Sequence, residues 1–435
     1  TEIYTLSLHD ALPILANDGK FDQVAIPGLS RLQTGRIDMY NLPDFEVGET
    51  ELIRRYLDKN HKYRNKEFTA RQRALIDDGF GMYSPEAYAA TAWMNFAALV
   101  GPDSIDEGSF RYDLREKGYI WAYGCNSGSF ISVHNTAYTS EFDSLPYHGV
   151  FTALFGSYNG DYDSRNNLLR ASIASNPSIL TCAWTGKPFW YLHHMALGEP
   201  IGYSTMLVQN NKTLYLSTGI HGLKGPHVAL FGDPTLRMHI IAPPANLKIE
   251  TSIDKDYNRK AVLQWEHSKD EILGYNIYRA EYSGQIFTKI NEEPVKDSVF
   301  TDEHPFLLSN YYKVRAIRLE KSATGSYYNL SGSAFGSTNF NKDTNTVYCR
   351  LMPNPVTDIL HIYLDLPVKS LVTAEIYNST GAKLRTIDWG MINSGVSRLD
   401  WNLTDRFGAV VSSGVYFISI KTGAISKTEK IVIAR

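Results

Sequence analysis

The sequence predicts a multidomain protein in which an α/β domain with a parallel sheet precedes two all-β sandwiches. Its 435 residues are enough for about three domains. In the first half, continuous apolar segments alternate with helical segments, which is typical of a parallel sheet covered on both faces. From residue 243 onward, short alternating segments separated by glycine-rich turns predict antiparallel strands.

The composition indicates a folded protein and excludes several classes. Hydrophobic residues make up 43% of the chain, charged residues make up 20%, and the formal net charge is −3. This balance excludes a wholly disordered chain and gives no support for nucleic-acid binding, which usually needs a basic excess. No apolar segment approaches the roughly 20 residues that cross a bilayer, so we expect no membrane span. The 3 cysteines form at most one disulfide bond and do not define the compartment.

Breaks in composition predict the domain boundaries. We expect an α/β domain over residues 16–242, a sandwich over 243–338, a linker over 339–346 and a second sandwich over 347–435. Pro243 and Pro244 interrupt regular structure at the first boundary, and a polar segment rich in glycine and asparagine marks the second. Residues 1–15 resemble a translated sequencing adapter, so we expect them to be an artefact and the first domain to be truncated at its N-terminus.

The first region contains the segments on which a site would be built. We predict helices over residues 49–64, 84–99 and 168–175, and strands over 73–76, 119–123, 150–155 and 179–184. The apolar face of the first helix is predicted to consist of Leu52, Ile53, Tyr56 and Leu57. Ser84-Pro85-Glu86 is a typical helix start. Ligands of parallel sheets bind beyond the carboxyl ends of the strands. The polar, glycine-rich segments 124–128 and 156–161, which each follow a strand, therefore mark the candidate site.

The middle region has the strand pattern of a small sandwich. Trp265 ends an early apolar strand, the segment 274–279 alternates apolar and polar residues, and Tyr311-Tyr312 begins a late strand. With the opening Pro243-Pro244, these segments resemble a fibronectin type III module, in which the late strand carries a tyrosine corner. The resemblance implies an immunoglobulin-like sandwich that serves as a spacer or binding unit.

The last region consists of short alternating strands and glycine turns. Met352-Pro353-Asn354-Pro355-Val356 precedes a strand, Asn378–Leu384 reads Asn-Ser-Thr-Gly-Ala-Lys-Leu, Ser413–Ile418 forms a later strand, and a basic strand over 427–435 ends the chain. In this order and spacing, the segments resemble the type A C-terminal sorting domain of the type IX (Por) secretion system of Bacteroidetes. The resemblance implies a second immunoglobulin-like sandwich, recognition by the type IX secretion machinery, export across the outer membrane, and release or attachment at the cell surface.

Segments of the first region resemble the gingipain-type cysteine peptidases. Gly35-Arg36-Ile37 before a charged helix is similar to one family segment, and Phe231–Arg237 (Phe-Gly-Asp-Pro-Thr-Leu-Arg) closely matches the terminal one. The resemblance implies a caspase-like parallel sheet, with a catalytic His-Gly after one strand and the nucleophilic cysteine after the next. This chain has Tyr123-Gly124-Cys125 at the first position and Gly156-Ser157-Tyr158 at the second, so the expected dyad is not matched.

Three interpretations of this region stay open. In the first, Cys125 is the nucleophile, His148 or His134 is its base, and backbone amides near Gly156-Ser157 stabilise the oxyanion; otherwise, Cys125 is a small buried residue at a strand end. In the second, a degenerate peptidase binds a peptide, protein or glycan in the former cleft. In the third, Ser157 is the nucleophile. A thiol needs a base or a cationic neighbour to become a thiolate, so the surroundings of Cys125 decide between them.

The segment after the second predicted strand has a metal-binding and a structural interpretation. Asp161, Asp163 and Asn167 have the oxygen-rich composition of a structural calcium loop, although the spacing is not that of an EF-hand. Alternatively, they form a hydrogen-bonded turn that caps the helix over 168–175. No other cofactor is expected.

Five further polar residues also have a functional and a structural interpretation. His193 and His194 are adjacent and cannot share a metal on one helix face, so one reaches the cleft or both pack. Asp77-Asp78 lines the site or forms a cap or surface turn. Asp233 precedes a proline and is expected to form a turn.

The sequence therefore predicts a secreted or surface-attached cargo of the type IX secretion system with a gingipain-like domain. That domain is either a cysteine peptidase or a non-catalytic adhesin on a degenerate peptidase scaffold. A histidine within hydrogen-bond reach of Cys125 favours the enzyme. Aromatic residues in the cleft without an activated nucleophile favour the adhesin, and the candidates are Tyr158, Tyr162, Trp184 and Trp190.

Overall fold

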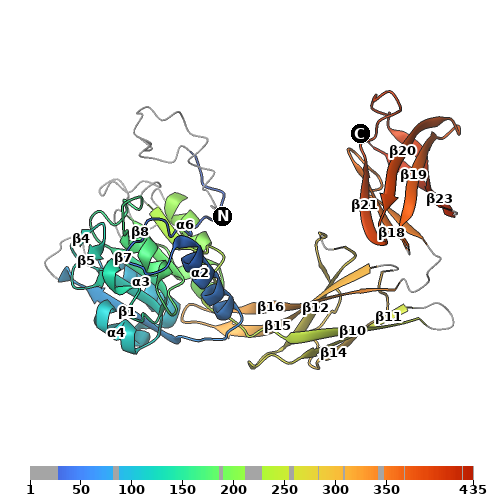
Figure 1. Ribbon diagram of the computed structural model, residues 1–435. Coiled ribbons are helices and arrows are strands. Elements are labelled where there is room, and N and C mark those ends of the chain that lie inside the picture. Colours follow the sequence, from blue (N-terminus) through green and yellow to red (C-terminus); the bar gives the residue numbers. More distant parts are fainter. Residues whose placement is uncertain are drawn as a thin grey trace.

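The computed structural model describes residues 28–81, 88–185, 190–210, 228–253, 259–282, 284–306, 309–340, 347–366, 368–423 and 425–434. Three groups of elements follow one another along the chain (Figure 1). We name them the α/β unit (α2 to β9), the middle unit (β10 to β16) and the tail unit (β17 to β23). Each unit has its own cluster of buried apolar side chains in this part of the chain. Residues 1–15 and the expected helix start at Ser84 lie outside the described residues.

The α/β unit contains the helices α2 (Glu49–Arg64), α3 (Ala90–Val100), α4 (Phe110–Glu116), α5 (Leu168–Ala174) and α6 (Ile201–Asn210). Its strands are β1 (Arg71–Asp78), β2 (Ile105–Glu107), β3 (Tyr119–Cys125), β4 (Gly128–Ser129), β5 (Ser132–Val133), β6 (Ala137–Tyr138), β7 (Gly149–Phe155), β8 (Thr181–Thr185) and β9 (Val228–Gly232). Short 3-10 helices are η2 (Pro102–Ser104), η3 (Thr139–Glu141) and η4 (His193–Leu197).

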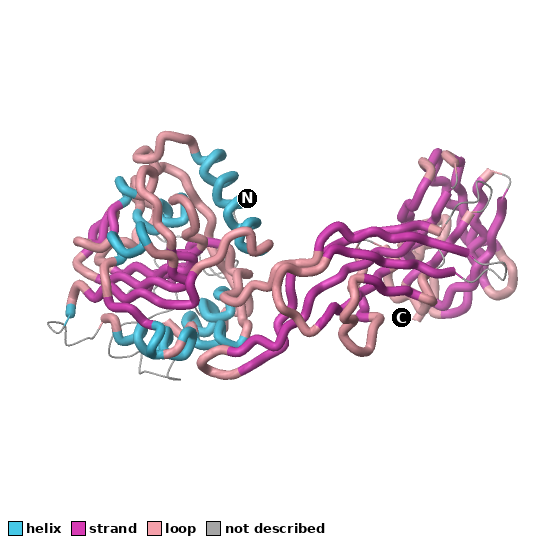
Figure 2. The backbone as a smooth tube through the Cα atoms, turned by 90° about the horizontal axis from the view of Figure 1, so that it is seen from below, coloured by secondary structure: helices cyan, strands magenta, loops and turns pink. Residues whose placement is uncertain are grey.

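The main sheet of the α/β unit has the strand order β2-β1-β3-β7-β8-β9 within the described residues. All neighbouring pairs are parallel except β8–β9, which is antiparallel. Every residue of β3 and of β7 is buried, because helices lie on both sides of the sheet (Figure 2). This burial explains why both strands are continuously apolar in the sequence.

Helix α2 has the predicted bounds but not the predicted buried face. Leu57 is 54% exposed, so its assignment to the apolar face was wrong. Lys59 and Asn60 are buried instead, because each has polar partners inside the protein. The Lys59 ammonium donates to the carbonyls of Ile173 and Ser175, at 2.7 and 2.6 Å.

The middle unit consists of two antiparallel sheets. Its strands are β10 (Ala245–Ile253), β11 (Arg259–Glu266), β12 (Gly274–Ala280), β13 (Thr288–Lys289), β14 (Val299–Asp302), β15 (Ser309–Lys321) and β16 (Ser326–Asn339). The sheet orders are β10-β11-β14 and β13-β12-β15-β16. Trp265 is buried as predicted. The buried Tyr312 differs from a tyrosine corner, because its hydroxyl donates to the Asp302 carboxylate at 2.8 Å and not to a backbone carbonyl.

The tail unit repeats this arrangement with seven further strands of the described chain. They are β17 (Tyr348–Met352), β18 (Leu360–Leu366), β19 (Ser370–Asn378), β20 (Lys383–Ile392), β21 (Gly395–Trp401), β22 (Gly414–Thr422) and β23 (Ile425–Ile433). They form the sheets β17-β18-β21 and β20-β19-β22-β23. Within the described ranges, no helix is both long and apolar enough to cross a membrane.

Specific contacts join the α/β unit to the middle unit. Lys66 forms a two-oxygen ion pair with Asp270, at 2.7 and 2.8 Å. At the turn between β15 and β16, the Thr324 hydroxyl donates to the carbonyl of Ala98 at 2.6 Å. The β15–β16 hairpin therefore contacts the end of α3, and it forms one wall of a cavity between the two units.

Candidate functional site

The loops after β1, β3 and β7 meet at the carboxyl edge of the main sheet. Strand β3 pairs with β7 from Tyr119↔Gly149 to Cys125↔Phe155, so the loops that follow them start side by side. A Cβ atom on Gly128 would lie 2.5 Å from the Cα of Gly156, closer than two carbon atoms tolerate. The two loops can approach this closely only because both residues are glycines.

The thiol of Cys125 lies in this edge, fully buried at the end of β3. Its Sγ contacts Oδ1 of Asp78 at 3.4 Å. Burial, and then the charge of Asp78 and the hydrogen bond to it, raise the pKa of Cys125 well above its ordinary value. The thiol is therefore protonated at neutral pH, which is the opposite of what a thiolate nucleophile needs.

Asp78 has a structural role as well. Its Oδ1 accepts hydrogen bonds from the backbone N–H groups of Phe80 and Gly81, at 3.2 and 3.0 Å. Asp78 thus forms a turn and also lies beside Cys125 at the candidate site, so both alternatives considered for the segment describe part of its role. The neighbouring Asp77 accepts from the N–H of Phe110 at 2.9 Å, at the start of α4, and burial raises its pKa.

An aromatic cluster covers the same edge. The ring centroid of Tyr88 lies 4.5 Å from that of Phe80 and 4.9 Å from that of Phe155. The hydroxyl of the buried Tyr123 donates to the carbonyl of Tyr88 at 2.8 Å. This packing excludes water from the end of β3, which is consistent with the strong effect of burial on the Cys125 pKa.

The structure does not bring His148 to Cys125. His148 directly precedes β7, and its carbonyl accepts from the N–H of Tyr119 at 2.9 Å, at the start of β3. It therefore lies at the amino edge of the sheet. Strand β7 has 7 residues, so at about 3.3 Å per residue roughly 20 Å separate the two edges. The predicted pair of Cys125 with His148 is corrected on this ground.

His134 does not replace it. The residue is exposed between β5 and β6, and its N–H donates to the carbonyl of Ser127 at 2.8 Å. The groups that shift the pKa of Cys125 are Asp78, Tyr123 and the backbone of Phe80, with no imidazole among them.

Ser157 is exposed in the turn after β7. Among the described residues, no hydrogen bond joins its hydroxyl to a base. The next residue, Tyr158, has a φ of 66°, a conformation that non-glycine residues rarely adopt, and its ring is 62% exposed. That ring lies 5.4 Å from the ring of Phe130, which is also exposed. The turn after β7 thus presents exposed aromatic side chains at this edge.

The loop over residues 161–167 caps a helix. Oδ1 of Asn167 accepts from the N–H groups of Leu169 and Arg170, at 3.0 and 3.3 Å, which is the geometry of an N-cap of α5. Its amide donates to the carbonyl of Asn159 at 2.9 Å. The assignment of Asn167 to a calcium site is corrected, because the oxygen that would bind the ion already accepts two hydrogen bonds.

The other proposed calcium ligands, Asp161 and Asp163, are exposed. In the part of the chain that the structure describes, no group of three or more His, Cys, Asp or Glu residues could hold a metal ion. His193 and His194 lie on η4 with their ring centroids 4.2 Å apart. Burial and then the charge of His194 lower the pKa of His193.

Asp233 fastens α2 to the end of β9. Its carboxylate accepts from the side-chain amide of Asn60 at 2.9 Å and from the Arg64 guanidinium at 2.6 Å. It also accepts from the N–H and the hydroxyl of Thr235, at 2.8 and 2.7 Å. The preceding Gly232 has a φ of 113° and lies against the carbonyl of Leu180. The Gly-Asp-Pro-Thr segment is therefore a structural turn, as predicted, with two helix residues as additional partners.

The tail unit supplies the identification. Two packed antiparallel sheets end the chain, and residues 350–434 match the family model of the secretion system C-terminal sorting domain. This domain makes the chain an exported protein of the type IX (Por) system. It is a cargo recognised by the type IX secretion machinery, and it is secreted or displayed at the cell surface.

Two solved structures match parts of the chain at low similarity. Dimeric latent PorU from Porphyromonas gingivalis is 11% identical, with a TM-score of 0.20 over 48% of this chain and 23% of the other. The chain thus spans less than a quarter of that protein. The central fibronectin-III array of RIM-binding protein is 14% identical, with a TM-score of 0.15 over 44% of this chain and 68% of the other. No curated protein matches the sequence.

Proposed function

We propose that this cargo is a non-catalytic binding protein of the cell surface, built on a gingipain-like scaffold. The domains run over residues 16–242, 243–338 and 347–435, with a linker over 339–346. The first has a caspase-like sheet, and the others are immunoglobulin-like sandwiches, the middle one of the fibronectin type III kind. The sheet order of the α/β unit, with parallel strands and one antiparallel edge strand, supports this assignment.

One observation carries the proposal. The only sulfur at the carboxyl edge among the described residues, that of Cys125, is buried against the carboxylate of Asp78. A carboxylate beside a thiol stabilises the protonated form, whereas an imidazolium would stabilise the thiolate. The cysteine that was considered as a nucleophile is thus a protonated thiol with no activating neighbour.

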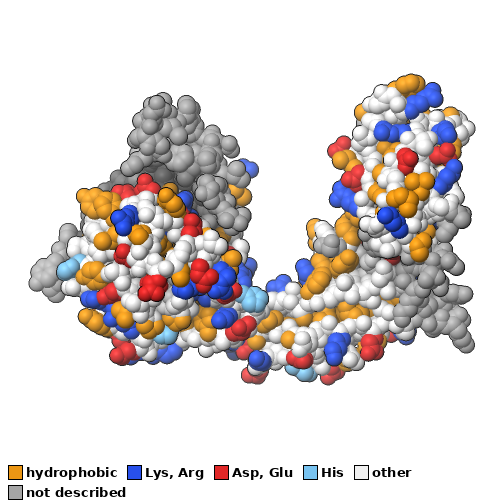
Figure 3. Space-filling model, viewed as in Figure 1, with side chains coloured by type: hydrophobic (Ala, Val, Ile, Leu, Met, Phe, Trp, Pro, Cys, Tyr) orange, Lys and Arg blue, Asp and Glu red, His pale blue; other side chains and the backbone are white. Residues whose placement is uncertain are grey.

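The same edge offers contacts for a ligand. Tyr158, Phe130 and Ile131 are 62%, 43% and 47% exposed, and Figure 3 shows hydrophobic side chains at the surface on the side of β4 and β5. Exposed rings of this kind provide contact area for a peptide, a protein or the apolar face of a sugar. These residues are where we expect a surface partner to bind.

Thiol reactivity tests the proposal. The native full-length protein is treated with N-ethylmaleimide from pH 6 to 9, and the labelling of each cysteine is followed by peptide mass spectrometry. Cys182 is the internal control, because it is completely buried and burial raises its pKa to about 11. We expect Cys125 to react no faster than Cys182 and both to react only after unfolding.

Rapid labelling of Cys125 at a pH below the free-thiol pKa of about 8.5 would overturn the proposal and favour the peptidase interpretation. The variant Cys125→Ala identifies the labelled site. If the native protein also cleaves a peptide substrate, loss of that cleavage in Cys125→Ala would count against a binding function in the same way.

A further inference from the structure

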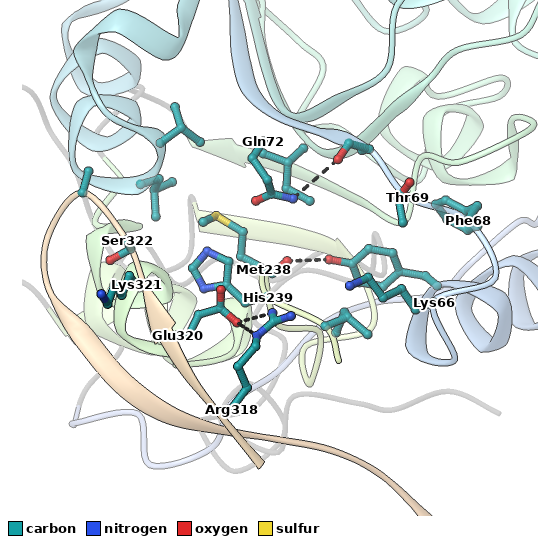
Figure 4. Close-up of a pocket in the computed structure, with 17 residues that line it drawn as sticks. Lys66, Phe68, Thr69, Gln72, Met238, His239, Arg318, Glu320, Lys321 and Ser322 are labelled. Atoms are coloured by element: carbon teal, nitrogen blue, oxygen red, sulfur yellow. Dashed lines mark hydrogen bonds and ion pairs between the residues drawn. The ribbon is translucent and has the colours of Figure 1, made fainter. Parts of the chain in front are cut away.

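A cavity of about 310 Å³ lies between the α/β unit and the middle unit. Its walls come from the entry to β1, the end of α3, the segment after β9 and the β15–β16 hairpin (Figure 4). It lies at the amino edge of the main sheet, away from Cys125. Its volume is at the lower end of the range of about 300–1,000 Å³ found for small-molecule sites.

The floor of the cavity is apolar. Leu99, Ile120 and Met238 line it and are buried. Phe68 adds an aromatic ring at the side. A surface of this kind favours a ligand that has at least one face of C–H groups.

Two cationic residues of the wall, Lys66 and Arg318, already have partners of opposite charge, whereas Lys321, which also lines the cavity, is exposed to solvent. Lys66 is paired with Asp270. Arg318 donates to Oε2 of Glu320 at 3.0 Å and lies 4.0 Å from the carboxylate of Asp270. To reach Lys66 or Arg318, an anionic ligand would have to displace an existing ion pair, and breaking a partly buried pair is unfavourable. The exposed Lys321 adds little to the binding of such a ligand, because solvent screens its charge.

Among the polar residues of the wall, His239, Glu320 and Gln72 keep hydrogen-bonding capacity for a ligand. Nδ1 of His239 shares a hydrogen bond of 3.0 Å with the Tyr327 hydroxyl, which leaves Nε2. Glu320 uses Oε2 for Arg318, which leaves Oε1. The Gln72 amide has one weak contact, at 3.5 Å, with the carbonyl of Ala70.

These groups surround the same space. Figure 4 shows His239 and Glu320 on one side of it and Gln72 on the other. Burial lowers the pKa of His239, so its ring is neutral at neutral pH. Together a neutral imidazole, an amide and a carboxylate whose charge Arg318 balances offer donors and acceptors, which matches a ligand whose groups both donate and accept.

We propose that this cavity binds a single uncharged sugar ring. Hydroxyl groups satisfy His239, Glu320 and Gln72, and the C–H face of the ring covers the apolar floor. A hydrocarbon ligand would leave the polar side chains unpaired, which costs affinity. A larger glycan binds through one ring, with the remainder outside the cavity.

Binding is measured on the full-length protein by isothermal titration calorimetry and saturation-transfer NMR. The probes are D-glucose, D-galactose, D-mannose, L-fucose and N-acetyl-D-glucosamine, with D-glucuronate as the charged ligand and cyclohexanol as the apolar one. We expect saturable binding of at least one neutral sugar. Glucuronate and cyclohexanol should bind at least about tenfold more weakly, equivalent to one lost hydrogen bond or displaced ion pair.

Matched variants test the location. His239→Phe and Gln72→Ala should each weaken sugar binding by about tenfold or more, since each removes a hydrogen-bonding partner. Tyr327→Phe removes the hydroxyl that holds Nδ1 but keeps the imidazole, and Glu67→Ala changes an exposed residue outside the cavity. Both controls should stay within about threefold of the wild type.

Failure of every neutral sugar to bind would overturn the proposal. Equal losses in His239→Phe and Tyr327→Phe would also contradict it, because they would mean that only the His239–Tyr327 contact matters. Neither outcome bears on the reactivity of Cys125, so the proposal and the assignment of a non-catalytic carboxyl edge fail independently.

Discussion

Replacing Asp233 with asparagine should loosen α2 from the main sheet. The carboxylate accepts four hydrogen bonds, two from α2 (Asn60 and Arg64) and two from Thr235. Asparagine keeps the size of the side chain and one acceptor oxygen. Its NH₂ group, however, replaces the oxygen that faces the two donors of α2.

The magnitude follows from these contacts. The bonds from Asn60 and Arg64 both end on Oδ2 of Asp233, so Asp233→Asn removes the acceptor of both, although the Arg64 guanidinium keeps the Thr235 hydroxyl as an acceptor. Each lost bond is worth about 1 kcal/mol, and the ion pair adds little because the Arg64 side chain is 41% exposed. We therefore expect α2 to lose about 2 kcal/mol of protection against opening.

The loss should depend on pH. Burial raises the pKa of Asp233, but the hydrogen bonds from Thr235 and Asn60 and the charge of Arg64 outweigh it, so the pKa lies below its ordinary value. A carboxyl with a lowered folded-state pKa stabilises the fold above the unfolded value of about 3.9 and loses that contribution as the pH falls further. The difference between wild type and Asp233→Asn should be full at pH 7 and shrink below pH 4.

Hydrogen exchange of the α2 amides in the full-length protein is the assay. Asp58→Asn is the control, because it makes the same substitution on the same helix, where the carboxylate is 54% exposed and paired with Arg54. That variant should change the opening free energy by less than about 0.5 kcal/mol. Unchanged α2 protection in Asp233→Asn, or a difference that persists at low pH, would refute the account of this turn.

Three further predictions concern buried contacts and export. Burial lowers the pKa of Lys59 to about 7, so the folded protein binds fewer protons than the unfolded chain between pH 7 and about 10. The opening free energy of α5, measured by hydrogen exchange, should therefore rise with pH in the wild type relative to Lys59→Met, by up to about 1.4 kcal/mol per pH unit. A difference between the two proteins that does not change with pH would contradict the burial effect. Asn167→Ala removes the N-cap of α5 and should lower the protection of that helix against hydrogen exchange by about 1 kcal/mol. Asn167→Asp should retain most of the protection. Equal losses in the two variants would argue against capping. Deletion of residues 347–435 should keep the protein inside a host that has the type IX system, as measured by cell fractionation, and surface display of the shortened chain would contradict the sorting assignment.

The central strands β3 and β7 of the main sheet were predictable because they are buried along their whole length. Strands β3 and β7 are uninterrupted apolar segments, and the structure extends each prediction by only one or two residues. Helices α4 and α6 and strand β9 were not predicted. Helix α4 is short and carries four charged residues in Phe-Arg-Tyr-Asp-Leu-Arg-Glu, so it has almost no hydrophobic periodicity to detect.

The buried face of α2 was not predictable from hydrophobicity alone. Lys59 and Asn60 are among the most polar residues of the helix, and yet they are buried while Leu57 is exposed. Their burial depends on acceptors far away in the sequence, namely the carbonyls at the end of α5 and the carboxylate of Asp233. A pattern within one helix contains no information about such partners.

Strand polarity already contained the information that separates Cys125 from His148. Cys125 ends one strand and His148 precedes the next. In a parallel sheet, the residue before a strand lies at the amino edge and the residue at its end lies at the carboxyl edge, so no packing of the loops could pair these two.

The direction of the Cys125 pKa shift, by contrast, could not be predicted from the sequence. Asp78 is adjacent to Cys125 only because β1 pairs with β3, with Asp78↔Cys125 as the last pair of the register. The sheet therefore places a carboxylate beside Cys125, where a cysteine nucleophile would need an imidazole, and this neighbour, more than the cysteine itself, is why we propose a non-catalytic edge.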